Sequence, residues 1–118
     1  MDGPHGTWLL IGNSRWHWAR ATATGLSCWH TQPAMAGPDP SPFDGLTAWA
    51  AVGAVPTALA GQQGCRLQLE DVPLPAMPPW LGIDRALAAW QAAGEQPEQP
   101  VLVADAGTAL SLTRVDRT

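Results

Sequence analysis

The chain has 118 residues, of which 46% are hydrophobic and 14% charged, and its formal net charge is −4 at pH 7. This length favours one domain, and the composition is that of a folded protein. The six basic residues, all of them Arg, are scattered, so the chain lacks the clustered basic face that nucleic-acid binding needs. Apolar runs stay well short of the roughly 20 residues of a membrane helix, and the acidic N-terminus differs from a signal peptide. We therefore expect a cytoplasmic protein with no nucleic-acid and no membrane partner.

The cysteines and histidines do not follow a metal-site pattern. Cys28 and Cys65 stand far apart, without the Cys-x-x-Cys spacing of zinc and redox sites, and the three histidines are equally isolated. Each cysteine lies in a short β-prone run, and a disulfide is not expected in a chain without an export signal. We therefore expect two buried free thiols and no zinc site.

The first part of the chain holds five segments with the pattern of β-strands. Thr7–Ile11 is apolar, Arg15–Ala23 alternates with period two, and Leu26–His30 follows a Thr-Gly turn, which predicts three antiparallel strands. After a proline-rich loop, Thr47–Val55 is a run of small apolar residues and predicts a buried strand parallel to the first. Cys65–Val72 alternates again and predicts an edge strand with one solvated face.

Two helices and a hairpin complete the expected fold. Pro56–Gln63 suits a short helix that begins with Pro, and Ile83–Ala93 predicts a longer amphipathic helix that Gly94 ends. Pro100–Ala104 and Ala109–Val115 predict two strands joined by a turn. The order βββ(α)βαβα followed by ββ predicts an α/β fold with a mixed sheet and the longer helix packed across it. Most of the seven tryptophans lie on these elements, where we expect them in the core. The apolar stripe expected on the longer helix consists of Ile83, Ala86, Leu87, Trp90 and Ala93.

The segment Gly12-Asn13-Ser14 lies between the first two predicted strands. A turn of this kind offers backbone N–H groups and a hydroxyl, which are the groups that bind phosphate oxygens. The same three residues also make a good β-turn. Taken by itself the segment therefore favours a plain turn.

The longer predicted helix opens with Asp84-Arg85, directly after Leu81-Gly82-Ile83. A carboxylate within hydrogen-bond reach of an alcohol can take its proton during group transfer. An Asp in the first turn of a helix also stabilises the helix dipole, by about 0.3–1 kcal/mol. The pair is thus compatible with catalysis or with helix stabilisation.

A second possible phosphate loop, Asp105-Ala106-Gly107-Thr108, follows the apolar strand near the end of the chain. Gly107 supplies a permissive backbone, Thr108 a hydroxyl and Asp105 a carboxylate for a cation. A tight hairpin turn would have a similar sequence. Its position at the end of a fully apolar strand favours the functional interpretation.

Together the three segments resemble the type III pantothenate kinases (Bvg accessory factor-like family) of the acetate kinase, sugar kinase, Hsp70 and actin superfamily. The resemblance implies an actin-like, ribonuclease H-like lobe over residues 1–99 and the start of a second, truncated lobe over residues 100–118. It implies ATP-dependent phosphorylation of pantothenate to 4'-phosphopantothenate, the first step of coenzyme A biosynthesis. It also implies Mg²⁺, a monovalent cation (K⁺ or NH₄⁺) and a homodimer. We expect the chain alone to be an incomplete enzyme that binds ATP weakly.

The resemblance also implies roles for individual residues. Asp84 is implied as the catalytic base for the pantothenate primary hydroxyl, a group too weakly acidic to ionise by itself at neutral pH. Asp105 is implied in the metal-binding region. Substrate binding is implied for Trp80, Gly82, Ile83 and Arg85. Binding of ATP or its phosphates is implied for Gly12, Asn13, Ser14, His17, Gly107 and Thr108.

Three positions depart from the family's pattern. The family's first-loop Asp falls on Leu10, its Lys on His17, and a Tyr of the substrate pocket on Pro79. The first change removes a carboxylate that helps to position magnesium. The second removes a fixed positive charge, which His17 supplies only when it is protonated. The alternative function is a non-catalytic binding or regulatory protein of the same fold, and a sugar kinase is a weaker third option.

Overall fold

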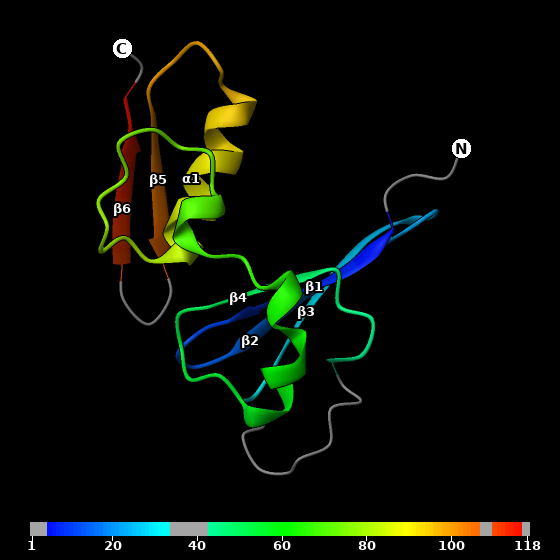
Figure 1. The fold of residues 1–118 in the computed structure, drawn as a ribbon. Coiled ribbons are helices and arrows are strands. Elements are labelled where there is room, and N and C mark those ends of the chain that lie inside the picture. The colour runs from blue at the N-terminus through cyan, green and yellow to red at the C-terminus, as the bar shows by residue number, and fades with distance from the viewer. Residues whose placement is uncertain (1–4, 34–42, 107–109, 117–118) are drawn as a thin grey trace. The chain divides into compact units, whose positions relative to one another are not determined.

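The computed structural model describes residues 5–33, 43–106 and 110–116. The chain divides into two compact units, Met1–Leu67 and Gln68–Thr118. The first unit contains a four-stranded sheet, and the second contains the longer helix and a two-stranded hairpin (Figure 1). The expected α/β class with a mixed sheet is confirmed. In the part of the chain that the structure describes, no helix is long and apolar enough to cross a membrane.

The sheet of the first unit has the strand order β3-β2-β1-β4. Its strands are β1 (Gly6–Ile11), β2 (Trp16–Thr22), β3 (Gly25–Thr31) and β4 (Ala48–Ala51). The first three pair in antiparallel fashion, and β4 pairs with β1 in parallel. These pairings confirm four of the predicted strands. The fourth is shorter than expected, because the chain leaves β4 after Ala51.

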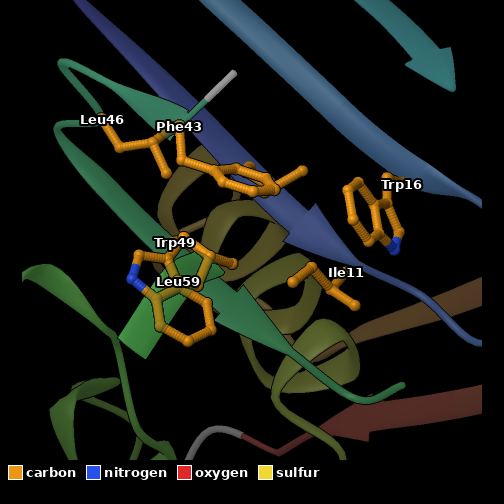
Figure 2. Close-up of a cluster of buried hydrophobic side chains, with 7 residues drawn as sticks. Ile11, Trp16, Phe43, Leu46, Trp49 and Leu59 are labelled. Atoms are coloured by element: carbon orange, nitrogen blue, oxygen red, sulfur yellow. The ribbon is translucent and has the colours of Figure 1, made fainter. Parts of the chain in front are cut away.

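One face of this sheet carries the hydrophobic core (Figure 2). Leu9 and Ile11 point to this face because side chains alternate along a strand, and both are buried. The register aligns Leu9 with Trp18 on one side and with Trp49 on the other, so these side chains share the face. Loop and helix residues close the cluster from outside the sheet. The buried cluster consists of Leu9, Ile11, Trp16, Phe43, Leu46, Trp49 and Leu59.

The tryptophans follow the core prediction only in part. Trp16 and Trp49 are buried, and the Trp49 indole Nε1 donates a hydrogen bond to the Gln62 carbonyl at 2.8 Å. Trp18 stacks on Trp29 with the ring centroids 6.1 Å apart and the planes at 3°. Trp29 stays 39% exposed because β3 is the edge strand. Such stacked pairs contribute about 0.5–1.5 kcal/mol beyond their burial.

The cysteines are both free, but the prediction that both are buried is wrong for Cys28. Cys28 lies on β3, where every residue is exposed, since this strand has no neighbour on its outer side. Cys65 is partly buried and its thiol contacts the Gln62 carbonyl at 3.3 Å. The β-prone sequence around Cys28 therefore predicted the strand correctly, but it did not predict that this strand lies at the edge of the sheet.

The short helix predicted at Pro56–Gln63 is present as the 3₁₀ segment η2 (Thr57–Cys65), which is kinked at Gln62. Pro56 precedes its first residue in an extended conformation, which proline's fixed φ allows. Leu59 is the buried residue of this helix and belongs to the core cluster. Ala58 and Cys65 of the same element are partly buried against the cluster, so Leu59 and these two smaller residues attach η2 to the core.

The predicted edge strand Cys65–Val72 is wrong. Only Arg66 forms a bridge, parallel to Trp49, and the adjacent Leu67 N–H donates to the Trp49 carbonyl at 2.7 Å. The chain then forms the 3₁₀ helix η3 (Leu69–Asp71).

The start of η3 is stabilised by local side-chain hydrogen bonds. Gln68 and Asp71 form a reciprocal capping box, in which the Asp71 carboxylate accepts the Gln68 N–H at 2.8 Å. This arrangement satisfies backbone donors that a strand would otherwise leave unpaired at a sheet edge. The local capping thus replaces the extended conformation that alternation alone predicted.

The second unit consists of the α-helix α1 (Ile83–Glu95), packed on the hairpin of β5 (Val101–Ala106) and β6 (Leu110–Val115). These elements confirm the predicted helix and both strands. The prediction that this helix packs across the mixed sheet is wrong in its partner, because the sheet that α1 packs on is the hairpin of β5 and β6. The predicted stripe is correct except at Leu87, which is only half-buried, and at Trp90, which is 46% exposed. Three of the four buried residues are alanines, whose small side chains allow the helix backbone to approach the hairpin closely. The buried residues of α1 are Ile83, Ala86, Ala89 and Ala93.

Truncation of the core should destabilise the first unit strongly. Leu59 is 0% exposed, so Leu59→Ala should lower the free energy of unfolding by about 2–5 kcal/mol through lost burial and a residual cavity. Urea unfolding followed by tryptophan fluorescence measures this change. Leu26→Ala is the control, because Leu26 is 67% exposed and its removal should cost no more than about 0.5 kcal/mol. Equal effects of the two substitutions would contradict the described core.

Candidate functional site

The first candidate loop joins β1 to β2. Its start is a tight turn, in which the Gly12 N–H donates to the Arg15 carbonyl at 2.9 Å. A Cβ on Gly12 would lie 2.7 Å from that same carbonyl oxygen, so the close approach requires glycine. Asn13 and Ser14 form the exposed tip of the turn. The expected turn is therefore present, with polar residues at its tip.

His17 lies beside this loop. A Cβ built on Gly12 would come within 3.9 Å of the His17 Cδ2 atom, so the imidazole edge is close to the start of the turn. His17 pairs with Leu10 on β1 and with His30 on β3, and the two imidazole centroids are 6.4 Å apart. Alternation places these three residues on the sheet face opposite the core cluster. The structure thus brings His17 next to the candidate phosphate loop.

The end of β4 meets the same loop. The backbone N–H groups of Val52 and Gly53 both donate to the Ile11 carbonyl, at 2.8 and 3.2 Å. The sequence pattern places Val52 and Gly53 only inside the predicted buried strand Thr47–Val55. The contact of Gly53 with the loop was missed, and the signal that could have found it is a glycine directly after a strand parallel to β1.

The second candidate group stands at the start of α1 in the second unit. Gly82 is the N-cap residue in an extended conformation, and its carbonyl accepts the first helical hydrogen bond, from Ala86 at 3.1 Å. Asp84 is half-buried in the first turn, and its Oδ1 accepts the Arg85 N–H at 2.9 Å. This hydrogen bond orients the carboxylate at the positive end of the helix.

The remaining predicted substrate residues differ in exposure. Arg85 is exposed, and Trp80 is 76% exposed just before the helix. The Ile83 side chain is 7% exposed and faces the interior. A ligand contact by Ile83 would therefore use its backbone, whereas Trp80 and Arg85 present side chains to solvent.

Asp105 lies near the end of β5, where it pairs with Ser111 of β6 and is exposed. Gly107 and Thr108 lie outside the described residues. Figure 1 shows α1 and β5 running in opposite directions while they pack together, so the start of α1 and the end of β5 lie at the same end of this unit. Asp84 and Asp105 therefore share that end. Within the described ranges, no three His, Cys, Asp or Glu residues come together as a metal site.

The fold and these residues define an α/β protein with a glycine-dependent polar turn and a carboxylate at a helix start. No family model matches the chain. The chain is 46% identical to a type III pantothenate kinase of Thermosynechococcus vestitus, over 89% of the chain and 42% of the relative. It is 37% identical to the type III pantothenate kinase of Synechococcus elongatus, over 92% of the chain and 50% of the relative. A third such kinase, from a Synechococcus species, is 51% identical over 57% of the chain and 26% of the relative.

The chain belongs to the type III pantothenate kinase family over the length that it matches. It spans about half or less of the length of these curated relatives.

Substitution of Gly12 should open the turn between β1 and β2. Gly12→Ala places a methyl group 2.7 Å from the Arg15 carbonyl oxygen, and we expect a loss of about 1–3 kcal/mol in the free energy of unfolding, as in other overpacked sites. Chemical denaturation measures the loss. Gly64→Ala is the control, since no heavy atom lies within 4 Å of a Cβ there. Gly12→Ala with the stability of the control would show that the turn is not closed as described.

Proposed function

We propose that the protein carrying this chain phosphorylates pantothenate with ATP and forms 4'-phosphopantothenate, the first step of coenzyme A biosynthesis. The observation that carries the proposal is the 46% identity to a type III pantothenate kinase across 89% of the chain. It is a proposal about the whole protein, because the chain spans 42% of that relative. We further propose the actin-like lobe over residues 1–99 and the start of a second lobe over residues 100–118.

In this proposal the first loop binds phosphate oxygens of ATP. The tip residues Asn13 and Ser14 are exposed and follow a turn that requires Gly12. Their backbone and hydroxyl groups are suitable donors for an anion. His17, whose imidazole lies beside Gly12, adds positive charge in its protonated form. Gly107 and Thr108 are proposed to bind phosphate in the same manner.

Asp84 is proposed as the general base. The primary hydroxyl of pantothenate must lose its proton as it attacks the γ-phosphorus, and a carboxylate at hydrogen-bond distance accepts that proton. The Arg85 N–H holds one carboxylate oxygen of Asp84, which fixes the direction of the base. The exposed Arg85 guanidinium is proposed to bind the substrate through its forked donors, with Trp80, Gly82 and Ile83 around it.

Asp105 is proposed to hold Mg²⁺ together with ATP. Its exposed carboxylate is a hard oxygen donor, and Mg²⁺ is commonly bound through one or two carboxylates plus substrate phosphates. When bound, the ion neutralises negative charge on the phosphates. The monovalent cation, K⁺ or NH₄⁺, and the homodimer are proposed from family membership.

A non-catalytic binding or regulatory function is the second candidate, and it is favoured by the residues around the first loop. Leu10 stands on β1 between His17 and Ala50, so no carboxylate is available at this position. His17 in place of Lys makes the positive charge dependent on protonation. The two functions are distinguished by turnover: a binding protein would retain ligand affinity and form no product.

The role of Asp84 can be tested in a chimera that joins this chain to the remaining sequence of the Thermosynechococcus vestitus relative. Asp84→Asn is nearly isosteric but cannot accept the hydroxyl proton, so kcat should fall by roughly 10²–10⁴-fold. Thermal melting should change little, because Asn also accepts hydrogen bonds at a helix start. The exposed Asp44→Asn is the control and should leave kcat unchanged. Wild-type turnover by a folded Asp84→Asn chimera would show that Asp84 is not the general base and only stabilises the helix.

A further inference from the structure

The residues that follow β4 are hydrogen-bonded to the start of the candidate phosphate loop. Because β1 and β4 are parallel, their C-terminal ends lie side by side, with Ile11 aligned with Ala51. The Ile11 carbonyl accepts two backbone hydrogen bonds, from the N–H groups of Val52 at 2.8 Å and Gly53 at 3.2 Å. Ile11 is the last residue before the loop, so this pair of bonds anchors the loop at its root.

Gly53 allows the segment that follows β4 to lie against the candidate phosphate loop. A Cβ on Gly53 would overlap the Gly12 carbonyl oxygen, and it would lie 2.8 Å from the Gly12 carbonyl carbon and 3.2 Å from the Asn13 Cα. All three are backbone atoms of the loop, and they cannot rotate away as the end of a flexible side chain would. Any side chain at position 53 must therefore displace the loop or break the hydrogen bonds to Ile11.

We propose that Gly53 is a positioning residue that fixes the conformation in which Gly12-Asn13-Ser14 binds phosphate. The proposal rests on the phosphate-binding function proposed above for this loop. Gly53 acts through Gly12 and Asn13, because its own contribution is the absence of a side chain at the contact. Phosphate affinity should therefore depend on a residue that offers no side-chain group to the ligand.

The chain contains a matched control for this substitution. Gly61 lies in η2 of the same unit, and no heavy atom lies within 4 Å of a Cβ built there. Gly61→Ala thus adds the same methyl group without a backbone contact. Differences between the two variants report the contact at Gly12 and not the general effect of replacing glycine.

The experiment is amide hydrogen exchange by NMR on the 118-residue chain, followed by titration with Mg·ATP. In Gly53→Ala, exchange of the Gly12 and Val52 amides should accelerate by about tenfold or more, as expected when one hydrogen bond is lost. Perturbation of the Gly12–Ser14 resonances by Mg·ATP should require about tenfold more nucleotide, the equivalent of one lost charge-assisted contact. Gly61→Ala should match the unsubstituted chain in both measurements.

A second measurement needs no substitution and covers the case in which Gly53→Ala fails to fold. Coupling between two sites is reciprocal, so Mg·ATP bound at the loop should slow exchange of the Val52 and Gly53 amides in the unsubstituted chain. If Mg·ATP does perturb the loop resonances, then unchanged exchange of the Val52 and Gly53 amides, or normal exchange and nucleotide response in a folded Gly53→Ala, would overturn the inference alone. If Mg·ATP perturbs no loop resonance while Gly53→Ala still accelerates exchange, the phosphate role of the loop falls, and this inference falls with it.

Discussion

The parallel pairing of β1 with β4 is the constraint on which the first unit depends. It makes β1 an interior strand, with β2 on one side and β4 on the other, and it aligns Leu9 with Trp49 in the core. It also brings the C-terminal ends of both strands to one edge of the sheet. The candidate phosphate loop follows one end and Gly53 the other, so core packing and loop geometry are set by the same register.

The core cluster explains why a short β4 is held firmly in the sheet. Four residues pair with β1, but Trp49 at their centre is buried and its indole nitrogen bonds to the Gln62 carbonyl. The Arg66 guanidinium lies 4.9 Å from the centre of the Trp49 ring system, at a distance typical of cation–π contact. One side chain thus connects the sheet, η2 and the segment that follows η2.

In the second unit, chain direction places two candidate site residues, Asp84 and Asp105, at one end. A helix that returns to a strand through a short connection runs antiparallel to it, so residues at the start of α1 lie near the end of β5. Asp84 and Asp105 are 21 positions apart in sequence and share this end for that reason (Figure 1). Asp84 is also in the first turn of a helix, where backbone N–H groups remain available to a ligand.

Local patterns predicted most elements correctly, and long-range contacts account for the failures. An apolar run located β1, period two located β2, and the amphipathic stripe located α1, because these patterns depend on neighbours in sequence. Cys65–Val72 alternates as a strand does, but the capping pair Gln68–Asp71 decides its conformation. The exposure of Cys28 and Trp90 depends on which segment packs beside them, and period alone does not specify that segment.

In the candidate site, too, local motifs could be predicted from the sequence and long-range contacts could not. The polar turn at Gly12 and the Asp-Arg helix start were visible as motifs, since each is a short continuous segment. The contact between Gly53 and Gly12 joins residues 41 positions apart, and it arises only when β4 pairs with β1 in this register. Such a contact has no local sequence pattern beyond the presence of a glycine.

Direct detection of product tests the proposed function most directly. The chimera with the Thermosynechococcus vestitus relative would be incubated with pantothenate and Mg·ATP, and 4'-phosphopantothenate would be measured by mass spectrometry beside the relative itself. The proposed function predicts product that requires both substrates. A folded chimera that binds nucleotide and forms no product, while the relative is active under the same conditions, would contradict catalysis and favour a binding protein of the same family.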